Sequence, residues 1–99
     1  MTTRTGPLSG LRVLELGSFI AGPFAGQLLG DYGAEVVKVE ATGVGDPMRT
    51  WGITRNGESL WWPVIARNKL SVELDLRSEE GRAVARELAL EVDIVLENF

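Results

Sequence analysis

Short apolar runs and stretches of helical spacing follow one another along the chain. Residues 11–16, LRVLEL, form an apolar run with β-branched content between glycines, which predicts a buried strand. A helix is predicted next, because Pro23 suits a first turn and Gly33 can end the helix. Its apolar side chains recur at helical spacing and are expected to cover the sheet: Phe24, Leu28, Leu29 and Tyr32. Residues 35–40, EVVKVE, predict a second strand, which gives a parallel β-α-β unit with a right-handed crossover.

The pattern resumes after a long irregular segment. Residues 41–68 contain glycines, two prolines and three tryptophans, and they predict a long loop with room for one short helix. Residues 70–76, LSVELDL, alternate between apolar and polar positions and predict a strand. Ser78 can cap the helix that follows. The apolar stripe of that helix consists of Val84, Ala85, Leu88 and Val92. Residues 94–96, IVL, predict a last strand.

These elements predict an α/β protein, in which a Rossmann-like parallel sheet carries flanking helices. The 99 residues suffice for one domain at most, and we predict a single α/β region over residues 1–99 that includes the loop 41–68. The last strand runs into Phe99 at the edge where α/β proteins place their binding loops. We therefore expect the predicted region to be the incomplete first part of a larger fold.

Composition and charge narrow the classes of function. The net charge of −4 gives no long-range attraction to nucleic acid or to an anionic membrane. The chain has no cysteine and no histidine, so it lacks a thiol nucleophile, thiolate metal ligands and the commonest general base. No apolar run approaches the about 20 residues of a membrane-spanning helix, and the polar start does not resemble a signal peptide. We expect a cytoplasmic protein that binds no metal, no nucleic acid and no membrane.

The turn between the first strand and the first helix is a candidate ligand site. Residues 17–26, GSFIAGPFAG, can hold a phosphate or diphosphate on backbone N–H groups, or can serve only for tight packing. The dinucleotide fingerprint G-x-G-x-x-G fails, because Gly17 is followed by Ser18 and Phe19. Glu40 ends the second strand, where an NAD-binding fold places its ribose-binding acid, although a solvent-facing carboxylate is the more common case there. The turn alone does not choose between these alternatives.

Several charged residues are further candidates for ligand contacts. Asp46 and Arg49 lie in a glycine-rich loop, where they can pair with each other or reach a charged ligand. Arg67 and Lys69 form a local basic spot, unless both are simply solvated.

Aromatic and acidic residues complete the candidates. The tryptophans can stack on a base such as adenine or pack against a partner chain; they are Trp51, Trp61 and Trp62. Four carboxylates could act in acid-base or nucleophilic catalysis, but no two of them have a spacing typical of such a pair: Asp31, Glu35, Asp75 and Glu97. The residue types and their spacing therefore do not define a catalytic site.

Five segments in this order resemble the family III CoA-transferases, the group around formyl-CoA transferase and carnitine CoA-transferase. They are PLSGLRVLEL, IAGPFAGQLLGDYGAEVVKVE, GDPMR, RNKLSVELDL and VDIVLENF. The resemblance implies the N-terminal part of a longer polypeptide that moves coenzyme A from an acyl-CoA donor to a carboxylic acid. It also implies an interlocked homodimer, and an aspartate in a later segment that forms mixed anhydrides and a CoA thioester. No residue of this chain aligns with that aspartate, so we predict no catalytic residue here.

The resemblance also assigns coenzyme A contacts to this chain. They are Ile20, Ala21, Leu74, Asp75, Leu76, Arg77, Asn98 and Phe99. Gly22 and the helix behind it are expected near the diphosphate, and Arg77 is expected to supply positive charge. Ile20 stands where formyl-CoA transferase has a glutamine, which makes formate and oxalate poor substrate candidates and favours a dicarboxylic or other organic acid. Ala41 stands where that enzyme has an arginine at the cofactor, so the nucleotide contacts are expected to be weaker or to use Arg49 or Arg67 instead.

Three alternatives stay open at this point. The α-methylacyl-CoA racemases share the same strands, but the loop before Asn68 is longer here than in their pattern. An NAD-type binding module is supported only by the β-α-β pattern and Glu40. A non-functional fragment would expose apolar surface that later sequence normally covers.

Overall fold

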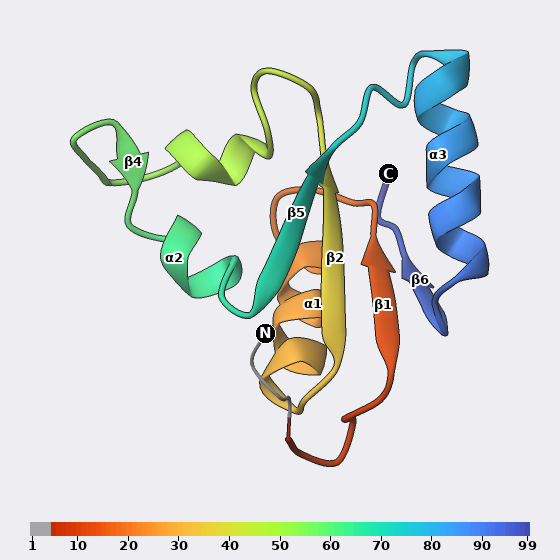
Figure 1. Ribbon diagram of the computed structural model, residues 1–99. Coiled ribbons are helices and arrows are strands. Elements are labelled where there is room, and N and C mark those ends of the chain that lie inside the picture. The colour runs from red at the N-terminus through yellow and green to blue at the C-terminus, as the bar shows by residue number, and fades with distance from the viewer. Residues whose placement is uncertain (1–4) are drawn as a thin grey trace.

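The structure is a computed structural model that describes residues 5–99 (Figure 1). Residues 1–4, at the polar start of the predicted region, lie outside the described residues. The elements of the first half are β1 (Arg12–Glu15), α1 (Ala21–Asp31), β2 (Glu35–Glu40), the 3-10 helix η1 (Pro47–Thr50), β3 (Thr54–Arg55) and β4 (Glu58–Ser59). Those of the second half are α2 (Trp62–Ile65), β5 (Lys69–Glu73), α3 (Glu79–Leu90) and β6 (Ile94–Leu96).

Four strands form a parallel sheet in the order β5-β2-β1-β6. Taken in chain order, these strands run third, second, first and fourth, which is the order that opens the doubly wound α/β fold. The predicted α/β class with a parallel sheet is confirmed. The predicted strands are found within two or three residues of their expected ends, and β2 has the predicted bounds.

Helix α1 packs on one face of the sheet through its smallest residues. Its buried positions are Gly22, Pro23, Gly26, Gln27 and Gly30. The prediction that its large apolar side chains cover the sheet is wrong for three of the four residues, because Phe24, Leu28 and Tyr32 are 42–56% exposed. Glycines let the helix approach the sheet closely, and this turns the bulky side chains outward.

The hydrophobic core lies between α1 and the sheet. Val13, Ala34 and Val36 are fully buried, and partly buried apolar residues pack against them: Leu8, Leu11, Leu29, Ile94 and Leu96. On the opposite face, Leu14 is fully buried, whereas Leu70 is 50% exposed. The outer strands of that face therefore present apolar surface.

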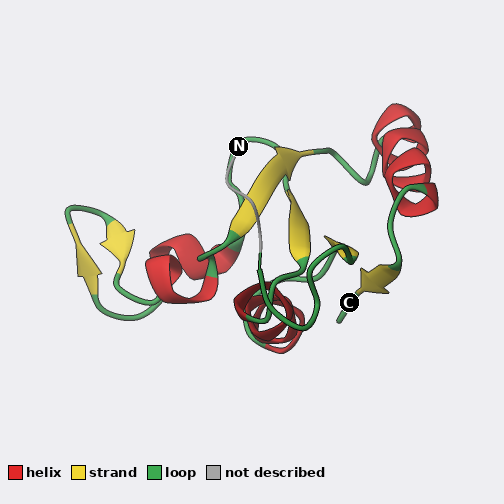
Figure 2. Ribbon diagram, turned by 60° about the horizontal axis from the view of Figure 1, so that its bottom comes forward, coloured by secondary structure: helices red, strands yellow, loops and turns green. Residues whose placement is uncertain are grey.

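Helix α3 connects β5 to β6, and Figure 2 shows it standing apart from the strands of the sheet. Ser78 caps it as predicted, since its hydroxyl accepts a hydrogen bond from the N–H of Gly81. The predicted apolar stripe is only half-covered: Val84 is 42% exposed, and Leu88 is half-buried. No helix of residues 5–99 has the length and apolarity to cross a membrane.

Residues 41–68 hold more structure than the predicted loop with one short helix. They contain η1, the two-stranded antiparallel hairpin β3-β4 and the one-turn helix α2. Figure 2 shows the hairpin well away from the main sheet. Elements of two to four residues are too short to show a hydrophobic period, which is why the sequence did not reveal them.

Candidate functional site

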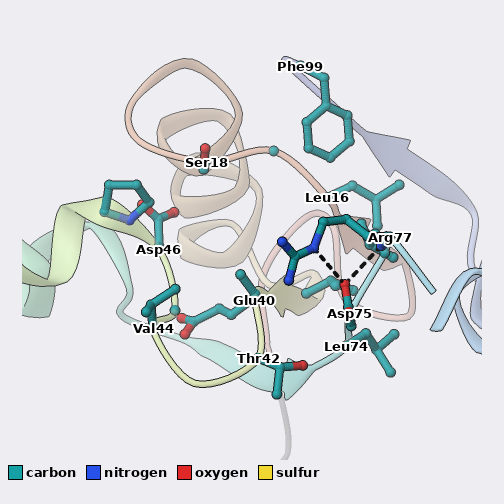
Figure 3. A pocket seen from close by; sticks show the side chains of 16 residues that line it. Leu16, Ser18, Glu40, Thr42, Val44, Asp46, Leu74, Asp75, Arg77 and Phe99 are labelled. Carbon is teal, nitrogen blue, oxygen red and sulfur yellow. Dashed lines mark hydrogen bonds and ion pairs between the residues drawn. The ribbon is translucent and has the colours of Figure 1, made fainter.

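A cleft of about 620 Å³ opens at the carboxyl ends of the parallel strands (Figure 3). Segments that follow β1, β2, β5 and β6 all contribute to it. The lining residues are Leu16, Gly17, Ser18, Val39, Glu40, Ala41, Thr42, Val44, Gly45, Asp46, Pro47, Leu74, Asp75, Leu76, Arg77 and Phe99. Open α/β sheets bind their ligands at this edge, and the volume is typical of a small-molecule site.

The predicted coenzyme A contacts divide into two groups in the structure. Leu74, Asp75, Leu76, Arg77 and Phe99 line the cleft. Ile20, Ala21 and Asn98 do not line it. Ile20 and Ala21 lie at the start of α1, two and three residues beyond the lining residue Ser18. Coenzyme A binding by these residues stays a prediction.

Asn98 holds the turn that follows β1. Its amide nitrogen donates to the carbonyl of Ser18, and its amide oxygen accepts from the N–H of Ser18, both at 2.9 Å. A Cβ atom at Gly17 would overlap that amide oxygen. Tight packing therefore explains Gly17, and the N–H of Ser18 is engaged within the protein.

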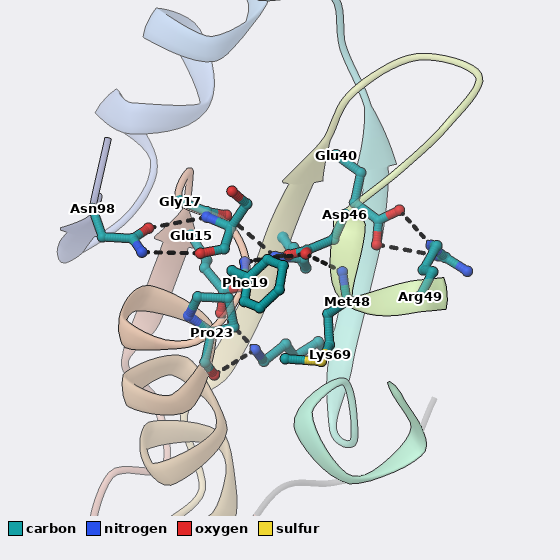
Figure 4. A network of polar contacts seen from close by, with 12 residues as sticks. Glu15, Gly17, Phe19, Pro23, Glu40, Asp46, Met48, Arg49, Lys69 and Asn98 are labelled. Carbon is teal, nitrogen blue, oxygen red and sulfur yellow. Dashed lines mark hydrogen bonds and ion pairs between the residues drawn. The ribbon is translucent and has the colours of Figure 1, made fainter. Parts of the chain in front are cut away.

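Four buried charges lie beneath this turn (Figure 4). Lys38 Nζ lies 2.8 Å from Glu15 Oε2 and 2.7 Å from Asp46 Oδ2, and Lys69 Nζ lies 2.7 Å from Glu15 Oε1. All four side chains are at most 3% exposed. Two ammonium and two carboxylate groups thus form a charge-balanced cluster, which we call the buried charge cluster.

The expectation that Arg67 and Lys69 are either solvated or form a local basic spot is wrong for Lys69, which belongs to the buried charge cluster. Lys69 is not solvated, because its ammonium also donates to the carbonyl of Pro23 at 2.7 Å. Burial lowers its pKa, against the opposing effect of Glu15. Arg67 is paired with Asp31 at 2.6 Å, and its hydrogen bond holds the pKa of the Asp31 carboxyl below its ordinary value. Neither cation is free to form a ligand site at this spot.

Glu40 is buried at the cleft and is fully engaged. Both of its oxygens accept hydrogen bonds from Arg49, at 2.9 and 3.1 Å, and the side chain of Glu40 is 2% exposed. The Arg49 guanidinium also lies 4.2 Å from the ring centre of Trp62. The expectation of a solvent-facing Glu40 is wrong, and its carboxylate is not free to bind a ribose.

The tryptophans lie outside the lining of the cleft. Trp51 meets the ring of Phe19 edge-on, with centroids 5.2 Å apart. The Arg49 guanidinium lies over the ring of Trp62, and Trp61 is 52% exposed. Stacking of a base on these rings inside the cleft is therefore not supported.

Arg77 is the one cation among the described residues that line the cleft. The carboxylate of Asp75 accepts hydrogen bonds from the backbone N–H and the Nε of Arg77, at 3.0 and 3.2 Å. These bonds hold the pKa of Asp75 below its ordinary value. The Arg77 side chain is 95% exposed, so it can turn toward an anion without losing packing contacts in the protein interior.

Acid is expected to destabilise the protein partly through Asp46. Burial raises the pKa of this carboxyl, but the hydrogen bond and charge of Lys38 and the N–H groups of Met48 and Phe19 outweigh it and lower the pKa below 3.8. The carboxylate therefore stabilises the fold above pH 3.8, and this stabilisation is lost as the pH falls through the lowered pKa.

The melting temperature, measured from about pH 5 down to about pH 2, should thus fall less steeply in Asp46→Asn than in the unaltered protein. The carboxyls of Asp31 and Asp75 titrate in both proteins, so the difference between the two curves isolates Asp46. Identical slopes would show that this carboxylate does not contribute.

A parallel sheet with a ligand-sized cleft at its carboxyl edge is the arrangement in which open α/β proteins bind small molecules. Residues 8–99 match CoA-transferase family III, and the chain belongs to that family. The resemblance drawn from the five sequence segments is confirmed.

Relatives and solved structures agree with this assignment. The chain is 63% identical over 94 residues to succinyl-CoA–D-citramalate CoA-transferase of Chloroflexus aurantiacus, covering 94% of this chain and 23% of that protein. It is 48% identical over 95 residues to the succinyl-CoA–L-malate CoA-transferase alpha subunit of Chloroflexus aurantiacus, covering 94% and 22%. A crystal structure of a CAIB/BAIF family protein from Brucella suis superimposes with a TM-score of 0.85 at 44% identity, covering 97% and 26%. The chain therefore spans about a quarter of the length of the proteins it matches.

Proposed function

We propose that this chain binds the coenzyme A part of an acyl-CoA thioester, in a protein that transfers coenzyme A to a carboxylic acid. The observation that carries the proposal is the cleft at the carboxyl ends of all four parallel strands in a member of CoA-transferase family III. Leu74–Arg77 and Phe99, the segments that the resemblance assigns to coenzyme A, meet in that cleft from β5 and β6.

The charges of the cleft suit an anionic ligand in one place only. The carboxylates of Glu40 and Asp46 are neutralised by Arg49 and Lys38. Arg77 is exposed, and its partner Asp75 lies two residues away in the sequence. The phosphates of coenzyme A would therefore be placed beside Arg77, where charge-assisted hydrogen bonds can form.

The names of the two relatives support a choice of donor and acceptor. One carries the name of a transferase for succinyl-CoA and D-citramalate, and the other for succinyl-CoA and L-malate. Succinate, citramalate and malate are all small dicarboxylic acids. We therefore assign succinyl-CoA as the donor and a small dicarboxylic acid as the acceptor.

We assign the nucleophile to a residue outside the described part of the chain. Two of the three carboxylates that line the cleft are engaged in ion pairs with other residues, Glu40 with Arg49 and Asp46 with Lys38. Asp75 pairs with Arg77, the residue proposed to hold the phosphates, so it would lie at the phosphate end of the ligand and not at the thioester. An unpaired aspartate from a later segment, as the resemblance implies, would attack the thioester carbonyl and release the thiolate of coenzyme A.

We further propose that the protein is located in the cytoplasm and forms an interlocked homodimer, as the resemblance implies.

Calorimetric titration with coenzyme A, and separately with NAD, tests the proposal. We expect coenzyme A to bind to the protein expressed at its natural full length, and NAD to give no signal. Arg77→Ala should weaken coenzyme A binding about tenfold or more, because one charge-assisted contact contributes about 1.5–3 kcal/mol. Arg55→Ala, which removes an exposed arginine of the hairpin outside the cleft, is the matched control and should bind as the unaltered protein does. Binding of NAD alone would refute the proposal.

A further inference from the structure

The turn that follows β1 contains a strained residue. Phe19 has a φ of 72°, in the left-handed region that residues with a Cβ rarely occupy. Such a conformation is strained and persists only when neighbouring groups hold it. Figure 4 shows Phe19 facing Asp46, a residue of the loop that follows β2.

The carboxylate of Asp46 holds this turn. Its Oδ1 accepts the N–H of Phe19 at 3.1 Å and the N–H of Met48 at 2.9 Å. Its Oδ2 lies 2.7 Å from Lys38 Nζ. The N–H of Phe19 also lies 3.2 Å from Oδ2. Both oxygens therefore hold the turn at Phe19, while Oδ1 also accepts the N–H of Met48 and Oδ2 also pairs with the charge of Lys38.

Lys38 contacts both Asp46 and the turn after β1 from the side of the sheet. Besides Asp46, its ammonium donates to Glu15 at 2.8 Å and to the carbonyl of Gly17 at 3.3 Å. Gly17 and Ser18 form one wall of the cleft, and residues 44–47 form another. The side chains of Lys38 and Asp46 are 3% and 1% exposed, so they act on these walls from below.

We propose that Asp46, supported by Lys38, is a positioning residue that fixes the two walls of the cleft in the arrangement that binds acyl-CoA. The inference rests on the proposed function. In it, the backbone N–H groups held by the Asp46 carboxylate set the shape of the cleft, whereas the ion pair with Lys38 stabilises the fold.

Two substitutions at Asp46 separate these roles in the full-length protein. Lys38→Met is included in both variants, because beside the Lys38 ammonium, 2.7 Å from Oδ2, the NH₂ group of an asparagine would set one donor against another. Lys38→Met with Asp46→Asn keeps an oxygen at Oδ1 for both N–H groups, whereas Lys38→Met with Asp46→Ala removes it. The dissociation constant for coenzyme A should be about tenfold higher in the alanine variant than in the asparagine variant, which should stay within about twofold of the unaltered protein. Asp31→Asn, which breaks an exposed ion pair outside the cleft, is the control for loss of a carboxylate charge.

Every outcome decides the inference. An unchanged dissociation constant in the alanine variant overturns it, and so does an equal rise in both variants, which would show that the ion pair matters and the N–H contacts do not. Both variants leave a balanced Glu15–Lys69 pair. If the alanine variant still does not fold, Asp46→Ala alone is compared with the unaltered protein. If the unaltered protein itself does not bind coenzyme A, the proposed function fails together with the inference.

Discussion

Replacing Lys38 with methionine is expected to lower the free energy of unfolding by about 3–5 kcal/mol, the usual cost of breaking a buried ion pair. Lys38 donates to Glu15 and to the carbonyl of Gly17, and lies 2.7 Å from Asp46. Without its ammonium, two buried carboxylates would share only Lys69. Chemical denaturation of the purified protein, followed by circular dichroism, measures the change.

A charge-balanced control distinguishes electrostatics from shape. Lys38→Met combined with Asp46→Asn removes one positive and one negative charge, so it should recover a substantial part of the lost stability. If the double variant is no more stable than Lys38→Met alone, the loss comes from packing and not from the unpaired carboxylate.

Gly26→Ala is expected to destabilise the protein, although alanine is the better helix former. A Cβ atom at Gly26 would overlap Oε1 of Glu15, a side chain that is 0% exposed and tied to Lys38 and Lys69. Either α1 must move away from the sheet or the buried charge cluster must rearrange. Overpacking of this kind costs about 1–3 kcal/mol.

Gly30→Ala, one turn further along the same face of α1, is the matched control. A Cβ atom there would make only ordinary contacts, at 3.5 Å or more, with Asn68 and Val36. Both variants gain the same helix propensity of up to about 1 kcal/mol, so Gly30→Ala should be neutral or stabilising. Equal melting temperatures for the two variants would contradict the close contact at Gly26.

The sheet could be predicted from the sequence because strand patterns are local. LRVLEL, EVVKVE and LSVELDL carry β-branched and alternating residues, and the parallel pairing follows from the helix between the first two strands. The packing of α1 could not be predicted in the same way. Hydrophobicity favours Phe24, Leu28 and Tyr32 as the buried face, but close approach to the sheet selects Gly22, Gly26 and Gly30.

The cleft was only partly predictable. Its location follows from the carboxyl ends of the predicted strands, and the same reasoning would have indicated the missed residues Leu16, Thr42 and Val44. The buried charge cluster gave no such signal. Glu15 and Lys38 stand in apolar strands with nothing in the spacing to pair them, and Asp46 and Lys69 reach them only through the tertiary structure.

The close approach of α1 to the sheet has a consequence for sequence variation. Because Phe24, Leu28 and Tyr32 lie on the outer side of this helix, their size is not constrained by the core of the described residues. The position that cannot change is a small one, since at Gly26 a single added carbon would meet a buried charge. A homologue could therefore replace the most hydrophobic residues on the outer side of this helix with little effect on the cleft, whereas one methyl group at the position of Gly26 would disturb it.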